Sequence, residues 1–438
     1  MTATLDSYAA EAERIDAGRR SNDPAWLTRV RRQAIERFQS LGFPTTRDEE
    51  WRFTSVAPIA DRQFRFAANG ASTFVAADLT PFRLPGDPVA ELVFVNGRYA
   101  AAASRVGKLP EGVVVESLAK ALVDRPSDVE AYVTHVASVD RQAFTALNTA
   151  FLADGALVLV PASTAVDRPI HLVFVSVAEG HPSMAHPRVL VVAGAGSEAS
   201  IVESYVSVGA DGYFTNTVTE IAAGQNATLN HYKLQRESAG SYHIGAMYVH
   251  AARDANVASH AVSFGGSLVR NDIAVVLDGE GGECTLNGLY LSDGRRLVDN
   301  HTTIDHAQPH CSSREVYKGI LADRARAVFN GKIIVRPDAQ KTDAKQTNKA
   351  LLLSEEAQIN TKPQLEIFAN DVKCTHGAAV GQMDEEAIFY LRARGLSAQE
   401  ARRLLIHAFA GDVLNRLPFE PLRARLEEEL LDHLPRYA

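Results

Sequence analysis

A cysteine and a histidine two positions apart, Cys374 and His376, are the residues of this sequence with the clearest capacity for chemistry. They follow a short apolar run at residues 365–368, and residues two apart in a strand share one face. Thiol and imidazole are therefore expected to be neighbours, with Lys373 lowering the thiol pKa. Such a pair suits iron, zinc or a persulfide sulfur, but two ligands do not complete a metal site. Further ligands must come from elsewhere or from another chain, and a buried thiol beside a hydrogen-bonded histidine is an equally good interpretation.

A second group of potential ligands lies within residues 300–313, and its members are His301, Asp305, His306, His310 and Cys311. The group resembles a ligand cluster. In a strand, however, His301 and Asp305 alternate with His306 and fall on the opposite face. The favoured interpretation is therefore structural, with these side chains forming ladders along neighbouring strands.

The three cysteines, Cys284, Cys311 and Cys374, are odd in number and far apart. This pattern argues against a disulfide framework and indicates a reducing compartment. Cys284 occupies a position where a repeated pattern otherwise has a small residue, so we expect a core residue there. Phosphate-loop, dinucleotide, serine-elbow and CxxC motifs are missing from the sequence, so any ATP chemistry must come from another subunit.

Composition describes an ordinary globular protein: 438 residues, 46% hydrophobic and 22% charged. The net charge of -8 makes nucleic acid and an anionic membrane poor partners. No apolar stretch approaches the roughly 18 residues of a spanning helix, and residues 1–20 lack the apolar core of a signal peptide. We expect a cytoplasmic protein with neither a membrane nor a nucleic-acid partner.

The chain before residue 157 predicts helices around a short β element. Apolar residues at helical spacing predict an N-terminal helix, and five prolines then indicate a linker, so residues 1–90 form a helical region and linker. Residues 91–95 predict a strand that ends in a hairpin at Asn96 and Gly97. Residues 113–152 predict a helical insertion. The apolar residues that predict the N-terminal helix are Trp26, Val30, Ile35, Phe38 and Leu41.

From residue 157 to about 381 short apolar runs alternate with Gly, Asp and Asn, and a local pattern recurs in which a small residue precedes a large apolar residue by two places. The small residues are separated by 28, 57, 43 and 30 positions, and a degenerate copy at Val257 divides the interval of 57. Such a repeat predicts a solenoid of strands, a β-helix over residues 91–382, although a β-sandwich with coincidental turn spacing remains the alternative. The copies begin at Ala199, Ala227, Cys284, Ala327 and Ala357.

Residues 383–438 predict a C-terminal helical region. Acidic residues open its first helix, and Ser397 with Glu400 forms a capping box for the second. The second helix carries an apolar stripe wide enough to need a partner. That stripe includes Leu404, Leu405, Phe409 and Val413.

Long ordered motifs across nearly the whole chain resemble the SufB/SufD family of iron–sulfur cluster assembly scaffold proteins. They include the segment DVKCTHG at 371–377 and the segment VDNHTTIDHAQPHCSS at 298–313. No cysteine precedes Cys284, whereas SufB proteins often carry an N-terminal cysteine cluster, so the chain is more similar to the SufD branch. Further matching segments are residues 42–54, 329–333, 338–354, 363–367 and 390–395.

The resemblance implies a mainly β protein: a right-handed parallel β-helix flanked by N-terminal and C-terminal helical regions, acting as a non-catalytic scaffold. It implies a complex of one SufB, one SufD and two SufC ATPases, in which helices over about 384–420 dock SufC. The SufB contact would join the ends of two β-helices. There the position of His376 would face a SufB cysteine at the site of nascent cluster assembly, with Cys374 beside it.

The cofactor implied by the resemblance is a transient iron–sulfur cluster shared with SufB. FADH2 accompanies the family's complex, but no flavin motif is found in this chain. One alternative is a SufB-like scaffold, or a homodimer formed when the chain is alone, that holds a cluster by itself. Another, from a different class, is a β-helix enzyme acting on polysaccharide, which the 7% aromatic content supports poorly.

Overall fold

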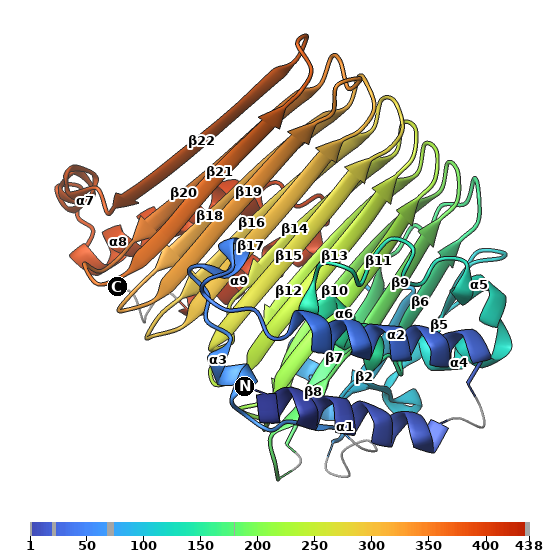
Figure 1. The fold of residues 1–438 in the computed structure, drawn as a ribbon. Coiled ribbons are helices and arrows are strands. Elements are labelled where there is room, and N and C mark those ends of the chain that lie inside the picture. Colours follow the sequence, from blue (N-terminus) through green and yellow to red (C-terminus); the bar gives the residue numbers. More distant parts are fainter. Residues whose placement is uncertain (1, 20–22, 68–73, 179, 434–438) are drawn as a thin grey trace.

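The computed structural model describes residues 2–19, 23–67, 74–178 and 180–433, and its centre is a stack of strands wound two to a turn (Figure 1). Each long strand pairs in parallel with the strand two positions away, as β10 (Glu198–Val208) does with β12 (Thr228–Arg236). The result is a parallel β-solenoid of about eight turns. The predicted β-helix is confirmed, and the β-sandwich alternative is wrong.

Two sheets form the walls of this solenoid. The first sheet contains, in spatial order, β21 (Gln358–Ile367), β19 (Arg326–Val335), β17 (Leu297–His306), β15 (Leu268–Leu277), β13 (Tyr242–Ala251), β11 (Phe214–Ala223), β9 (Arg188–Ala193), β6 (Gly155–Val160) and β5 (Val114–Ser117), with β8 (Ser183–Ala185) and β1 (Arg65–Phe66) beside them. The second sheet contains β22 (Lys373–Gln382), β20 (Asp343–Leu352), β18 (Ser312–Leu321), β16 (Glu283–Ser292), β14 (Asn256–Ser263), β12, β10, β7 (Ile170–Val177), β2 (Ala90–Val95) and β3 (Arg98–Tyr99), with β4 (Arg105–Val106) paired to β2.

Copies of the repeat seen in the sequence lie in both sheets of the solenoid. Ala199 and Cys284 lie in the second sheet, whereas Ala327 lies in the first, which explains the interval of 43 residues as one and a half turns. The copies are not stacked in register, because Ala199 pairs with Leu229 rather than with Ala227. The motif therefore marks the start of a strand and not a fixed position in the ladder.

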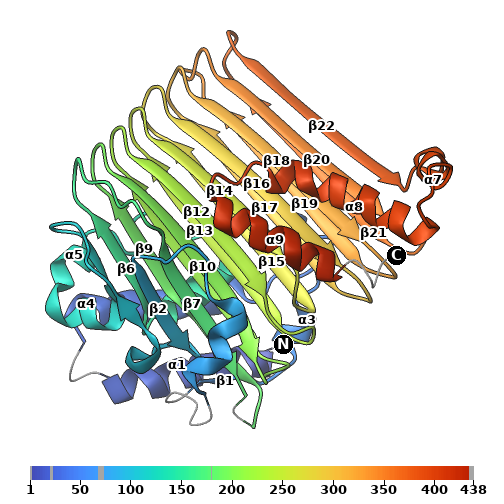
Figure 2. The same ribbon diagram turned by 180° about the vertical axis from the view of Figure 1, so that it is seen from behind.

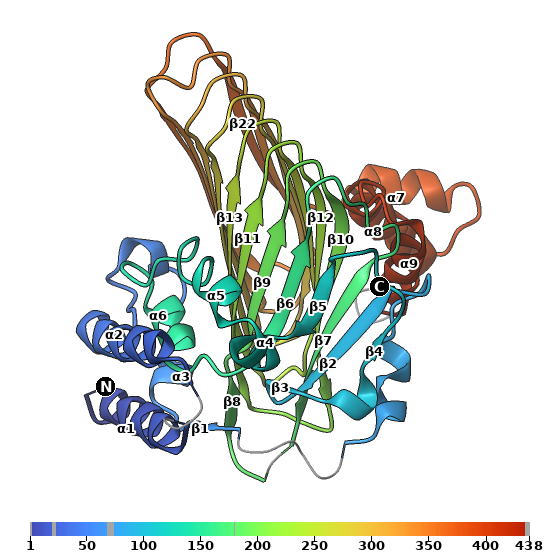
Figure 3. The same cartoon turned by 90° about the vertical axis from the view of Figure 1, so that its right-hand side faces the viewer.

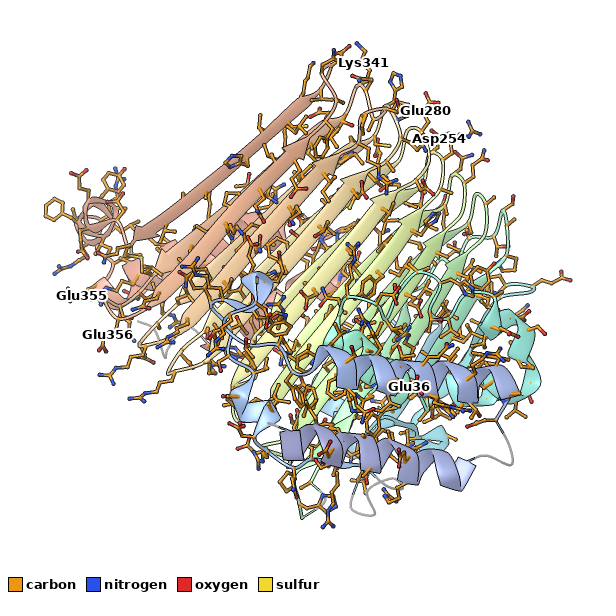
Figure 4. The ribbon with its side chains drawn as sticks, in the orientation of Figure 1. Glu36, Asp254, Glu280, Lys341, Glu355 and Glu356 are labelled. Atoms are coloured by element: carbon orange, nitrogen blue, oxygen red, sulfur yellow. The ribbon has the colours of Figure 1, made fainter. Side chains whose placement is uncertain are left out.

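Turns join the two sheets along two edges of the solenoid. Asp254, Glu280 and Lys341 lie on the turns from the first sheet to the second, and Glu355 and Glu356 lie on a turn at the opposite edge (Figure 4). Asp254 and Lys341 have φ values of 54° and 63°. Asp and Asn adopt this left-handed conformation more readily than most residues, which accounts for the polar spacers between strands.

Side chains that point into the solenoid fill it in layers. In β16 the inward residues are Cys284, Leu286 and Tyr290, all at most 2% exposed, so Cys284 is a core residue as expected. Nearer the N-terminal end an aromatic column crosses three strands, and its rings stack with centroids about 5 Å apart. The column consists of Phe94, Phe174 and Tyr205.

The N-terminal region lies against the outer face of the first sheet (Figure 3). Its elements on that face are α1 (Thr2–Arg19), α2 (Ala25–Leu41), the 3-10 turn η1 (Glu49–Trp51) and α3 (Ala57–Ala60), whereas the 3-10 segments η2 (Ala76–Phe82) and η3 (Ala101–Ala103) pack against strands of the second sheet. The predicted helix corresponds to α2, and the hairpin at Asn96 and Gly97 joins β2 to β3.

The expected helical insertion at 113–152 needs a correction at its start. Val114–Ser117 forms strand β5, which pairs antiparallel with β6, because its side chains alternate between half-buried and buried. Helices follow only from Leu118: α4 (Leu118–Asp124), α5 (Pro126–Glu130) and α6 (Ala143–Ala150).

The C-terminal helices lie beside the second sheet: the last two cover its outer face, and the first lies beyond the end of β22 (Figure 2). They are α7 (Glu385–Arg392), α8 (Ala398–Leu414) and α9 (Glu420–His433), and Ser397 and Glu400 form the predicted capping box of α8. Leu289 and Leu291 of β16 pack beneath them. None of the described helices is long and apolar enough to cross a membrane.

Candidate functional site

The solenoid ends in an open coil, formed by β21 and β22. Among the described strands, β22 pairs with β20 alone and β21 with β19 alone. Apolar side chains are exposed here: Ile367 by 39%, Phe368 by 64% and Val380 by 47%. An unpaired edge beside exposed apolar surface is a template for another chain.

The hydrogen bonds between β22 and β20 show which backbone groups of β22 face its free edge. The amide of Lys373 donates to the carbonyl of Thr342 at 2.8 Å, so this residue faces β20. Because backbone groups alternate sides along a strand, those of Cys374, His376 and Ala378 point to the free edge.

The neighbouring edge of β21 is partly blocked. Gln358 donates its amide to Ala325 at 3.0 Å, so the same alternation turns Pro363 toward the free side. Proline has no amide hydrogen to donate and is a common guard of edge strands. Of the two edges, β22 therefore offers the more complete row of donors and acceptors.

Cys374 and His376 lie on one face of β22, as their spacing predicts. In register they pair with Ala344 and Gln346, which places both side chains on the inner face of the wall. Cys374 is half-buried against Ile333 and its neighbours, and His376 is exposed. Their Cα atoms are about 6.6 Å apart along the strand, so an atom between them could be reached by both.

The expected effect of Lys373 on the thiol is wrong. Burial raises the pKa of Cys374 above its ordinary value, so the thiol keeps its proton at neutral pH. Lys373 lies on the other face of the strand, because neighbouring residues alternate.

A buried carboxyl lies in the same layer as His376. Gln346, paired in register with His376, donates through Nε2 to Glu315 Oε2 at 2.7 Å. Glu315 is 1% exposed, and burial raises its pKa to about 7. A group that binds and releases a proton near neutrality therefore lies two strands behind the exposed imidazole.

The pair at the open end is not a complete metal site. No group of three or more His, Cys, Asp or Glu side chains is placed to hold a metal ion in the part of the chain that the structure describes. Two ligands leave a tetrahedral or octahedral ion with at least half of its positions to fill. An iron ion held by this pair would therefore need further ligands.

The cluster at 300–313 is dispersed by the fold. His301 and Asp305 point outward and pair with Asp299 and Arg336, at 2.9 and 2.8 Å. The inward His306 contacts Ser313 at 2.9 Å, and the two remaining members lie at a turn and in the core. These last two are His310, with φ 60°, and Cys311, 1% exposed.

A network of polar side chains lies inside the solenoid and was not predicted from the sequence. His231 lies between Glu203 and Ser259, with contacts of 3.0 and 2.9 Å, and His243 Nδ1 lies 2.7 Å from Glu237 Oε2. All are buried. The signal in the sequence was the alternation itself, since polar residues occupy inward positions of strands whose other inward residues are apolar.

The four residues expected to dock a partner on α8 differ in exposure. Leu404 is 46% exposed, Leu405 and Phe409 are half-buried, and Val413 is 1% exposed within the core beneath the helix. Val413 therefore holds the helix on the β-helix and does not reach the outer surface.

Fold and site together define a parallel β-helix protein whose open end presents a thiol and an imidazole on a strand with one unpaired edge. Two family descriptions match the chain: "SUF system FeS cluster assembly, SufBD core domain" at residues 174–409 and "SufBD protein N-terminal region" at residues 4–172. The chain belongs to this SufBD family of iron–sulfur cluster assembly proteins.

Individual relatives agree with the family match. The chain is 35% identical to an iron–sulfur cluster assembly SufBD family protein of Synechocystis sp., over 92% of this chain and 90% of that protein. It is 33% identical to the iron–sulfur cluster assembly protein SufD of Escherichia coli, over 92% of each. The SufD of Bacillus subtilis is 27% identical over 92% of this chain and 93% of its own length.

Proposed function

We propose that this chain is a scaffold subunit of the SUF complex that joins a SufB-type partner through β22 and completes a cluster assembly site at the junction. The observation that carries the proposal is the unpaired edge of β22, whose inner face presents Cys374 and His376. The exposed apolar residues around it support burial of this end in a complex.

The two side chains would have different roles at the junction. His376 is exposed and can bind iron as soon as a partner supplies further ligands. Cys374 keeps its proton and is half-buried, so it would bind only after the thiol is deprotonated. His376 is therefore the principal ligand of the proposal and Cys374 the secondary one, and the cluster itself is transient cargo.

The ATPase activity of the proposed complex belongs to a SufC-type subunit, and this chain contributes no catalytic step. Apolar side chains on α7 and α8 support docking there: Phe389 is 73% exposed, Tyr390 56% and Leu404 46%. We do not include FADH2 in the proposal, because no flavin-binding motif is found in the sequence. The compartment we propose is the cytoplasm, where free thiols such as these stay reduced.

Proline substitution tests the pairing through β22. Ala378→Pro removes an amide from the free edge only, so the chain should fold while recovery of a coexpressed SufB-type partner falls about tenfold or more. Ala379→Pro is the matched control, because it removes an amide that faces β20 and should lower the melting temperature. Full recovery of the partner with Ala378→Pro would overturn the pairing.

The alternative of a self-sufficient SufB-like scaffold or homodimer is tested by anaerobic reconstitution with iron and sulfide. We expect the purified chain to retain no stoichiometric cluster, since no group of three or more His, Cys, Asp or Glu side chains is placed to hold a metal ion among its described residues. A stable cluster on the chain alone would favour the homodimer.

A further inference from the structure

A cavity of about 510 Å³ separates the N-terminal segment from the outer face of the first sheet. One wall is residues 46–54, which include η1, and the other is made by β17, β19 and β21. The size falls within the range of small-molecule sites, about 300–1,000 Å³. No step of the scaffold proposal uses this cavity.

The floor of the cavity is a network of ion pairs that leaves no carboxylate free. Asp299 binds Arg270 at 2.7 Å and His301 at 2.9 Å. Glu50 contacts His301 at 3.2 Å, and Glu49 pairs with Lys362 at 2.6 Å. Each of the three acids that line the cavity is thus paired with a cation, although Arg270 is shared with Asp272.

Two arginines at the rim have no such partner. Arg47 and Arg52 line the cavity and are exposed, and neither forms an ion pair with a carboxylate among the described residues. Their guanidinium groups are suited to bidentate binding of phosphate or carboxylate oxygens. The uncompensated charge of the cavity is therefore positive.

A buried acceptor on the wall is also unused. Asn330 is 6% exposed, and its Nδ2 donates to Glu50 Oε2 at 3.1 Å. Because a carboxylate only accepts, the amide nitrogen must face Glu50, and Oδ1 is left without a partner. Burial of an unsatisfied acceptor is unfavourable. A ligand that donates a hydrogen bond would relieve it.

We propose that this cavity binds a phosphate ester that carries hydroxyl groups, a sugar phosphate or a nucleotide. The phosphate contacts Arg47 and Arg52, and a hydroxyl donates to Asn330 Oδ1. Phe53, 46% exposed in the same cavity, has the Arg52 guanidinium over its ring at 5.7 Å from the centroid, and a base would stack on the opposite face. The proposal is independent of the scaffold role and of the open end of the solenoid.

Isothermal titration of the full chain with ribose 5-phosphate and with AMP tests the proposal. Ribose 5-phosphate should bind about tenfold more tightly than inorganic phosphate, which cannot reach both ends of the cavity. Arg47→Ala combined with Arg52→Ala should weaken both esters about tenfold or more. The matched control, Arg392→Ala with Arg394→Ala, removes equal charge from the other end of the chain and should leave binding unchanged.

Phe53→Ala distinguishes the two ligand sources. If Phe53→Ala weakens the binding of AMP but not that of ribose 5-phosphate, the cavity is a nucleotide site. If it changes the binding of neither ligand, the cavity is a sugar-phosphate site. The proposal is overturned if neither ester binds up to about 10 mM, if inorganic phosphate binds as tightly as ribose 5-phosphate, or if the double arginine variant binds like the parent. All three altered side chains are exposed, so the variants should keep the parent melting temperature.

Discussion

At the scale of single residues, charge placement inside and outside the β-helix wall determines which groups hold protons. His301 lies between Asp299 and Glu50, and although burial opposes its charge, these carboxylates raise its pKa to about 9. Asp299, beside Arg270, has a pKa lowered to about 2 despite its burial. Both groups are therefore charged at neutral pH and anchor the N-terminal segment.

The raised pKa of His301 predicts a pH-dependent stability. Its contribution is fully present below the ordinary histidine pKa of about 6.5 and is lost as the pH rises through about 9. A shift of this size corresponds to about 3 kcal/mol. Urea unfolding should show that His301→Gln costs about 3 kcal/mol more at pH 6 than at pH 10. An equal cost at the two pH values would contradict the assigned charge.

The stability contributed by Glu315 should also fall as the pH rises, because its pKa is raised by burial. Its pKa in the folded state, about 7, exceeds the ordinary value of 4.5, so ionisation destabilises the fold as the pH rises from 4.5 to 7, and the penalty is constant above that. Glu315→Gln should therefore gain about 3 kcal/mol relative to the parent between pH 5 and pH 8. The measurement is thermal or urea unfolding at both pH values, and no relative gain would mean that the carboxyl is ionised at little cost.

At the scale of elements, the two faces of α8 have separate tasks. Ile406 is fully buried against the second sheet, whereas Leu404 on the same helix is 46% exposed. Sequence spacing located the helix and its cap but mixed the two faces, because Leu405, Phe409 and Val413 also fit an apolar stripe. Which side faces the solenoid depends on β16 and β18, about 100 residues earlier in the chain.

Substitutions on the two faces should therefore separate stability from docking. Ile406→Ala should reduce the free energy of unfolding by about 2–5 kcal/mol. Leu404→Ala should change it by less than about 0.5 kcal/mol but weaken recovery of a coexpressed SufC-type ATPase. Copurification and urea unfolding measure the two effects. Unchanged recovery with Leu404→Ala would remove this face from the docking surface.

At the scale of the whole molecule, the sequence predicted what depends on local spacing and missed what depends on distant contacts. The β-helix and the shared face of Cys374 and His376 follow from strand periodicity. The raised pKa of Cys374 arises from its burial against an earlier coil, and the cavity needs residues 46–54 to meet Asn330 about 280 positions later. No local pattern reports either contact.

The central claim is that the open end of the solenoid contributes half of a cluster site. The most direct test is the iron and sulfide content of a complex coexpressed with SufB-type and SufC-type partners, comparing His376→Ala with Thr375→Ala, a change on the opposite face of β22. We expect intact assembly in both, a cluster content roughly tenfold lower with His376→Ala, and no loss with Thr375→Ala. Normal cluster content with His376→Ala, or a complex that falls apart, would contradict it.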